Sequence, residues 1–133
     1  MIQGVNHIGI AVKDMAAAVA FFEKGLGLRP SGEEIVEDQF VRVVFFHVGG
    51  VKIELLESTS PDGPIGKYIA KKGPGLHHLT LSTDGIDGDL DKMRSEGMRL
   101  IDNQSRAGAH GTKIAFVHPE STGGFLLELC EEA

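Results

Sequence analysis

Alternating apolar and polar positions predict strands along much of this chain, and helical spacing interrupts the alternation in each half. Residues 4–12 alternate around a row of isoleucine and valine, which is typical of a strand. Asp14 is a suitable N-cap for the alanine-rich helix that follows, and Gly27 should end that helix. Gly49-Gly50 predicts a hairpin turn between the last two of the next three strands. Those strands are expected at about 33–38, 41–48 and 51–57. The first half is therefore predicted to be βαβββ.

The second half repeats this order after a turn-rich linker at residues 58–63. Pro64 should begin a short helix that ends at Gly73. A strand at about 76–83 and a helix at about 87–96 follow, each with the spacing of apolar residues that its type requires. Shorter strands are expected near 98–102, 112–118 and 124–131.

Matched residues in the same order indicate that the two halves arose by internal duplication. His7 and His78 are 71 positions apart. Glu54 and Glu128 are 74 positions apart, because the turn before the second glutamate is longer. Two strand strings share the offset of 71, at residues 42–47 and 113–118.

Length and composition fit one α+β domain made of two tandem βαβββ modules. A chain of 133 residues with 41% hydrophobic content can bury one core, whereas either half alone would bury little surface. The expected parts are module 1 at about 1–57, the linker and short helix at 58–73, and module 2 at about 74–133, all within one domain at 1–133.

Charge and segment composition argue against several classes of partner. The formal net charge of −6 is unlike that of a general nucleic-acid-binding protein. No apolar run reaches the roughly 18 residues of a transmembrane helix, and Lys13 and Asp14 interrupt any early signal-like segment. Cys130 is the single cysteine, which fits a reducing compartment. We expect a cytoplasmic protein without nucleic-acid or membrane partners.

Two histidines and two glutamates at repeat-related positions point to a divalent metal site. A single strand histidine such as His7 or His78 is a ligand in only about one case in ten, since backbone groups usually satisfy its nitrogens. An ionised carboxylate among apolar residues, as at Glu128, is costly unless it is paired or binds a metal. Glu54 could instead share an exposed face with Lys52. If a two-fold axis relates the modules, however, all four side chains converge.

Imidazole and carboxylate ligands suit a first-row divalent ion such as Co, Mn, Zn or Ni, and four protein ligands leave positions open to substrate. The His-Glu-His-Glu order in paired βαβββ modules resembles the vicinal oxygen chelate superfamily, which includes glyoxalase I. Further strings make the whole chain similar to the methylmalonyl-CoA epimerases, and GLHH, GAHG and FVHP are the more specific of them. These strings are DGPIGK at 62–67, GLHH at 75–78, RAGAHG at 106–111 and FVHP at 116–119.

The resemblance implies a glyoxalase-like fold, with a curved, partly closed mixed sheet around one divalent ion per chain. Its ligands would be His7, Glu54, His78 and Glu128. The implied function is metal-dependent epimerisation of a 2-substituted malonyl-CoA thioester, such as methylmalonyl-CoA, by 1,1-proton transfer through a metal-stabilised enolate. Glu128 is the favoured catalytic base and Glu54 its partner across the substrate. Family members are commonly dimers, so a homodimer is expected.

Four basic residues are candidates for binding the acyl-CoA substrate. Lys67 and Lys71 lie one helical turn apart and, with Arg106, could hold the CoA phosphates. A solvated helix face is the simpler explanation of the two lysines. His110 lies in a glycine-rich loop and could contact the substrate, unless that loop serves only the geometry of a turn.

The second catalytic base and two rival functions stay open at this level. Some epimerases carry a further glutamate on the strand that here contains Arg42 and Val43, neither of which is a carboxylate. Glu54, a metal-bound water or a carboxylate of the turn at 37–39 could take that role. The rival functions are lactoylglutathione lyase (glyoxalase I) and a non-catalytic, ligand-sequestering protein of the same fold, which usually lacks the full set of ligands.

Overall fold

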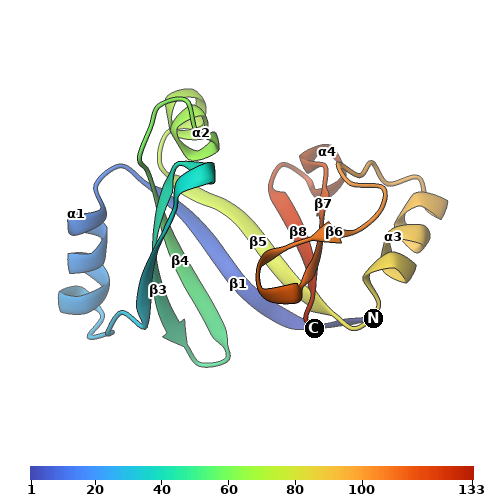
Figure 1. The fold of residues 1–133 in the computed structure, drawn as a ribbon, viewed down its shortest axis with the longest axis horizontal. Helices are drawn as coiled ribbons and strands as arrows, with labels where there is room; N and C mark the ends of the chain where they lie inside the picture. The colour runs from blue at the N-terminus through green and yellow to red at the C-terminus, as the bar shows by residue number, and fades with distance from the viewer. The chain divides into compact units, whose positions relative to one another are not determined.

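Strands and helices in the computed structural model, which describes residues 1–133, follow the predicted order closely (Figure 1). The first half contains β1 (Ile2–Val12), α1 (Met15–Ala20), the π-helical turn η1 (Phe21–Gly25), β2 (Gly32–Val36), the 3-10 turn η2 (Glu37–Gln39), β3 (Val41–Val48) and β4 (Val51–Ser58). The second half contains α2 (Pro64–Lys72), β5 (Gly75–Thr83), α3 (Ile86–Ser95), β6 (Arg106–Ala107), the 3-10 turn η3 (Ala109–Gly111), β7 (Lys113–Val117), α4 (Pro119–Thr122) and β8 (Leu126–Glu131).

Local sequence signals explain where the main elements begin and end. The Asp14 side chain accepts a hydrogen bond from the Ala17 backbone amide, which caps α1 as predicted. Gly49 has a φ of +62°, a left-handed conformation that the tight turn between β3 and β4 requires. Pro64 stands in the first turn of α2, and Gly73 ends that helix. The predicted α2 is therefore confirmed.

The predicted strand at 98–102 is wrong. Only Leu100 pairs there, in an isolated bridge with Val117. The Asp102 carboxylate accepts a hydrogen bond from the Phe116 backbone amide at 2.8 Å, so a side chain occupies the position that a ladder carbonyl would fill. The Asp102 amide itself donates to the Phe116 carbonyl. Pairing therefore stops after one bridge, and β7 takes the short strand β6 as its neighbour instead.

The chain forms two compact units, which we call unit 1 (Met1–His7 and His78–Ala133) and unit 2 (Ile8–His77). In unit 2 the strand order is β2-β3-β4-β1, with antiparallel pairing from β2 to β4. Apolar side chains from both faces of these strands are buried. One cluster, which packs with α1, contains Met15, Val44, Phe46 and Leu55. A second cluster, which packs with α2, contains Ala11, Val41, Val43, Leu56 and Ile65.

Unit 1 has the strand order β1-β5-β8-β7-β6, with β5 parallel to β8 and the remaining pairs of β8, β7 and β6 antiparallel. Its buried apolar cluster joins α3 to one face of the strands and contains Ile86, Leu90, Ala115 and Leu129. Because strand side chains alternate, His78, Thr80 and Glu128 point to the opposite face. Parallel and antiparallel pairs together confirm a mixed sheet of the α+β class. None of the helices has the length and apolar character needed to cross a membrane.

Candidate metal centre

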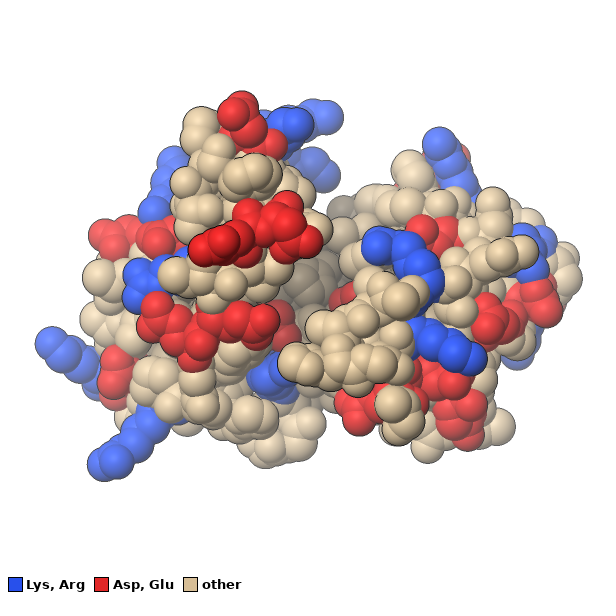
Figure 2. Space-filling model, viewed as in Figure 1, with Lys and Arg blue, Asp and Glu red and all other residues tan.

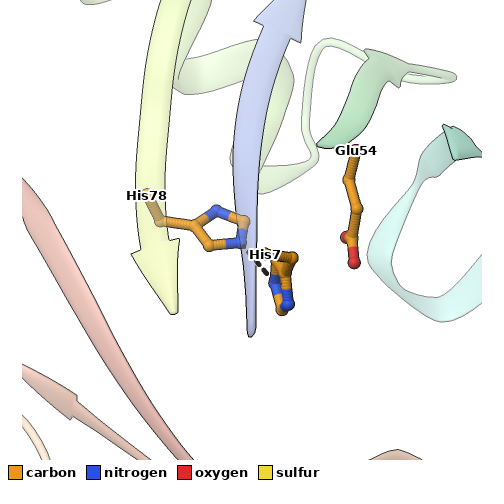
Figure 3. Close-up of side chains that lie close together, drawn as sticks. All are labelled: His7, Glu54 and His78. Atoms are coloured by element: carbon orange, nitrogen blue, oxygen red, sulfur yellow. Dashed lines mark hydrogen bonds between the residues drawn. The ribbon is translucent and has the colours of Figure 1, made fainter. Parts of the chain in front are cut away.

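His7 and His78 bring two ring nitrogens together in unit 1. His7 lies on β1 and His78 on β5, and their Nε2 atoms are 3.1 Å apart (Figure 3). The rings meet edge to face, with centroids 5.1 Å apart. Two ligands bound at about 2.1 Å, with about 90° between them, lie about 3.0 Å from each other. The spacing of the two nitrogens therefore fits a shared divalent ion.

Glu128 on β8 lies beside the imidazole of His7. Its Oε1 atom is 3.7 Å from His7 Nε2, and the exposed fractions of the two side chains are 12% and 14%. Thr80, directly opposite Glu128 in the parallel register, donates its hydroxyl proton to Glu128 Oε1 at 2.6 Å. The same hydroxyl oxygen is 3.1 Å from His7 Nε2. His7 Nε2 thus lies close both to His78 Nε2 and to the Glu128 carboxylate, and such nitrogen and oxygen donors suit a first-row divalent ion.

Burial and charge set the proton affinity of Glu128. Burial raises the pKa of the Glu128 carboxyl above its ordinary value, because it penalises the charged form. The hydrogen bond from Thr80 and the positive charge of Arg106 both act in the opposite direction and only partly offset the burial. A carboxyl that binds a proton more readily than an ordinary glutamate is the stronger general base of the two.

Arg106 lies on the Glu128 side of unit 1. Its guanidinium is 5.4 Å from the centroid of the Phe116 ring, and Phe116 pairs directly with Glu128 across β7 and β8. Arg106 Nε also donates to Asp102 Oδ1 at 3.3 Å. Of the residues predicted to bind substrate, Arg106 is therefore placed beside the carboxylate in the same unit.

Glu54 belongs to β4 of unit 2, and its membership of the same site stays a prediction, although Figure 3 also draws its side chain. The Lys52 ammonium lies 3.5 Å from Glu54 Oε2, and only 13% of the glutamate side chain is exposed. Lys52 in turn lies over the Phe45 ring, 4.9 Å from its centroid. Glu54 is therefore largely buried and paired with the lysine that shares its strand face.

The remaining candidates for substrate binding are exposed. Lys67 and Lys71 lie on α2 in unit 2, one turn apart as predicted. His110 lies in η3 with a φ of 56°, a left-handed conformation that is uncommon outside glycine. A Cβ at Gly108 would lie 2.5 Å from the Thr112 hydroxyl oxygen, so a glycine is needed there for close approach. The loop geometry thus explains this glycine, while the contact of His110 with substrate stays a prediction.

The histidine that precedes His78 has different surroundings. The His77 ring meets the Tyr68 ring edge to face, with centroids 4.7 Å apart, in unit 2. Burial and, secondarily, the nearby Lys72 charge lower the pKa of His77 below its usual value. The adjacent histidines therefore contact different rings, as strand alternation predicts.

Neither residue at the position of the second glutamate of some relatives can act as a base. Arg42 Nε donates to Glu33 Oε1 at 2.7 Å, and its guanidinium lies 3.9 Å from Glu57. Val43 is buried in the apolar cluster beside α2. Glu37 and Asp38, which belong to the turn considered as an alternative, are exposed in η2. Figure 2 shows acidic side chains gathered on the surface in this region of unit 2.

Thr80, which bridges His7 and Glu128, was not predicted from the sequence. Threonine is common in strands because its branched side chain packs well there, so its type carries no signal of function. Its position, however, did indicate a role, because Thr80 lies two residues after His78 and therefore on the same strand face.

Comparison with known proteins identifies the family. Residues 6–116 match the glyoxalase/bleomycin resistance protein/dioxygenase superfamily, and the chain belongs to this superfamily. The uncharacterized Bacillus subtilis protein YqjC is 43% identical over 96% of this chain and 91% of its own length. Human mitochondrial methylmalonyl-CoA epimerase is 35% identical over 94% of this chain and 72% of its own. A solved structure of methylmalonyl-CoA epimerase in complex with methylmalonyl-CoA and NH4+ is 34% identical and covers 100% of this chain and 96% of that one, with a TM-score of 0.86.

Proposed function

We propose that this chain is a metal-dependent methylmalonyl-CoA epimerase. The observation that carries the proposal is the position of His7 Nε2, which lies 3.1 Å from His78 Nε2 and 3.7 Å from the buried Glu128 carboxyl, whose pKa is raised. Relatives named methylmalonyl-CoA epimerase cover nearly the whole chain, which supports the choice of substrate. The enzyme is proposed to work in the cytoplasm as a homodimer.

His7, Glu54, His78 and Glu128 would hold one divalent ion, with Co, Mn, Zn and Ni all compatible with these ligands. Such an ion supplies Lewis acidity that stabilises negative charge on the substrate's oxygen atoms. Arg106, Lys67 and Lys71 are proposed to bind the CoA phosphates, and His110 to contact the acyl group. The two negative charges of the Glu54 and Glu128 carboxylates would balance the two positive charges of the ion.

Epimerisation requires that a proton leave one face of the α-carbon and return to the other. Glu128 is proposed to exchange a proton with one face, because its carboxyl binds protons more readily than an ordinary glutamate. Glu54 is proposed as the opposing base, because the duplication makes it the counterpart of Glu128. The Thr80 hydroxyl holds Glu128 Oε1, which leaves the other carboxylate oxygen for the proton.

The test is exchange of the α-proton of methylmalonyl-CoA into heavy water, run beside a glyoxalase assay with a glutathione hemithioacetal. We expect exchange and epimerisation with the thioester, about one divalent ion per chain, and no glyoxalase turnover. Loss of the ion in a His7→Ala plus His78→Ala variant is also expected. Glyoxalase turnover without exchange would replace the proposed function by the lyase, and absence of both activities would favour a ligand-sequestering protein.

The two-base scheme has a more specific test. In single turnovers at matched metal occupancy, Glu54→Gln and Glu128→Gln should lose exchange preferentially for opposite enantiomers of methylmalonyl-CoA, because each residue serves one face. Equal losses for both enantiomers in both variants would point to a single base.

A further inference from the structure

We propose that Asn6 is a positioning residue that selects the tautomer of His7 and thereby directs the Nε2 lone pair of this ring into the metal site. The inference rests on the proposed function only for its effect on metal affinity, because the tautomer itself is a property of the metal-free protein. The residues that carry it all belong to unit 1.

Glu132 fixes the orientation of the Asn6 amide. The Asn6 Nδ2 group lies 3.2 Å from Glu132 Oε1 and 3.3 Å from the Ser82 hydroxyl. An ionised carboxylate only accepts hydrogen bonds, so the amide nitrogen must face Glu132, and the amide oxygen must face the other way. The Ser82 hydroxyl can accept from the same nitrogen and reinforces this orientation.

The oriented amide then fixes the proton on His7. Asn6 Oδ1 lies 2.7 Å from His7 Nδ1. An amide oxygen only accepts, so Nδ1 must carry the proton of this hydrogen bond. In a neutral imidazole the other nitrogen then presents its lone pair, and this lone pair binds a metal ion. The chain of hydrogen bonds from Glu132 through Asn6 to His7 thus selects the His7 tautomer that can bind a metal ion through Nε2.

Two oxygen acceptors lie near the nitrogen that this tautomer leaves unprotonated. The Thr80 hydroxyl oxygen lies 3.1 Å from His7 Nε2, but its single proton goes to Glu128. The carboxylate of Glu128 itself lies 3.7 Å from Nε2. Neither of these two oxygen groups offers a proton to the Nε2 lone pair, and the third neighbour, His78 Nε2 at 3.1 Å, is the other predicted nitrogen ligand. A divalent cation at this point would therefore complement the selected tautomer.

The experiment is nitrogen NMR of ring-labelled histidine in the metal-free protein at about pH 8, above the ordinary histidine pKa of about 6.5. We expect the Nδ1–H signature for His7 in the wild type and a shift toward the Nε2–H form in Asn6→Leu, which lacks the acceptor. Competition with a chelator should show that this variant binds Co²⁺ about 10- to 100-fold more weakly, the usual effect of losing such a supporting contact. Asn6→Asp keeps an acceptor oxygen and should keep the wild-type tautomer.

Glu132→Lys provides an independent variant at an exposed position. A lysine donates where the glutamate accepts, so the Asn6 amide should turn its oxygen toward residue 132 and favour the Nε2–H form of His7. Glu96→Lys makes the same change of charge at an exposed site on unit 1 and should leave the tautomer unchanged.

A persistent Nδ1–H signature for His7 in Asn6→Leu overturns the proposal. Should that variant not fold, persistence of the signature in Glu132→Lys overturns it instead. If the wild type binds no divalent ion, the proposed function fails, while the tautomer comparison still decides the role of Asn6.

Discussion

Unit 1 and unit 2 begin their main helices with the same device. In unit 2 the Glu57 carboxylate accepts a hydrogen bond at 2.7 Å from the backbone amide of Met15, the first residue of α1. In unit 1 Glu131 accepts one at 2.8 Å from the amide of Ile86, the first residue of α3. Glu57 lies three positions after Glu54, and Glu131 lies three positions after Glu128, so these contacts also repeat in the two halves of the duplication. A carboxylate at a helix N-terminus satisfies an orphan amide and complements the helix dipole.

The same glutamates also form matched cross-strand ion pairs. Glu57 lies opposite Arg42, with 3.9 Å between the charged groups, and Glu131 lies opposite Lys113, at 4.0 Å. Arg42 and Lys113 are 71 positions apart. Arg42, one of the two residues that could occupy the position of the further glutamate of some epimerases, is therefore part of a repeated ion pair, which explains a basic residue at position 42.

The units differ in what the faces of their strands carry. Unit 2 has an apolar cluster on each face, one beside α1 and one beside α2. The apolar cluster of unit 1 lies on the α3 face, and the opposite face carries His78, Thr80 and Glu128. The two units thus share the contacts at their helix N-termini and the cross-strand ion pairs, but the second face of their strands carries different residues. This is possible because the shared contacts do not involve the face that carries His78, Thr80 and Glu128.

The largest expected effect distinguishes a catalytic from a structural glutamate on the same strand, β8. Glu128→Gln should lower the epimerisation rate about 10²- to 10⁴-fold, because the variant loses the basic carboxylate but keeps an oxygen that can bind the metal. The measurement is the steady-state rate, with metal content determined in the same samples. Glu131→Gln is the matched control three residues later, and its rate should stay near that of the wild type. A normal rate in fully metallated Glu128→Gln would leave this residue a purely structural role.

The repeated helix caps offer a smaller and symmetrical test. Glu57→Ala and Glu131→Ala should each lower the free energy of unfolding by about 1 kcal/mol, an effect of the size seen when a side-chain acceptor at a helix N-terminus is lost. Urea unfolding followed by circular dichroism measures both, and Glu34→Ala, at an exposed position on β2, serves as the control. Clearly unequal losses in the two cap variants would mean that the duplicated contacts no longer have equivalent roles.

Sequence patterns predicted most of the fold, because alternation, glycines and caps act locally. The strand expected at 98–102 failed for a non-local reason, since the pairing there is interrupted by a side-chain contact from Asp102 to another strand. The short helix α4 was not predicted, because it has only four residues, beginning at Pro119, and so few residues show no helical spacing of apolar positions. It lies in the longer turn before Glu128, where the two halves differ in length.

The candidate site was predictable only where the duplication repeats a residue type. His7, His78 and Glu128 stand out because each has a counterpart in the other half, and the structure places His7 beside both of the others. Asn6 and Thr80 have ordinary types for a strand, so their roles follow only from distances. The duplication reveals residue types that occur in both halves of the chain. The residues that orient them, Asn6 and Thr80, are recognised only from the geometry of unit 1.

The smallest expected effect concerns a contact of unit 1 that unit 2 does not repeat. The Asp87 carboxylate, in the first turn of α3, accepts hydrogen bonds from the Ser105 amide at 3.2 Å and hydroxyl at 3.1 Å. The residue 71 positions earlier is Ala16, which cannot make this contact. The contact ties the loop that follows residues 98–102 to α3.

These hydrogen bonds, first from the Ser105 amide and then from its hydroxyl, lower the pKa of the Asp87 carboxyl, with small contributions from Lys113 and Arg94. A carboxyl whose pKa is lower in the folded than in the unfolded state stabilises the fold above its ordinary pKa, about 3.9. That stabilisation is lost as the pH falls through the lowered pKa. Asp87→Asn should therefore be less stable than the wild type at neutral pH, by a small amount because the group is exposed, and the difference should disappear in acid. Urea midpoints of both proteins between about pH 7 and pH 2 measure this, and a difference that stays constant with pH would show that the charge of Asp87 does not stabilise the loop.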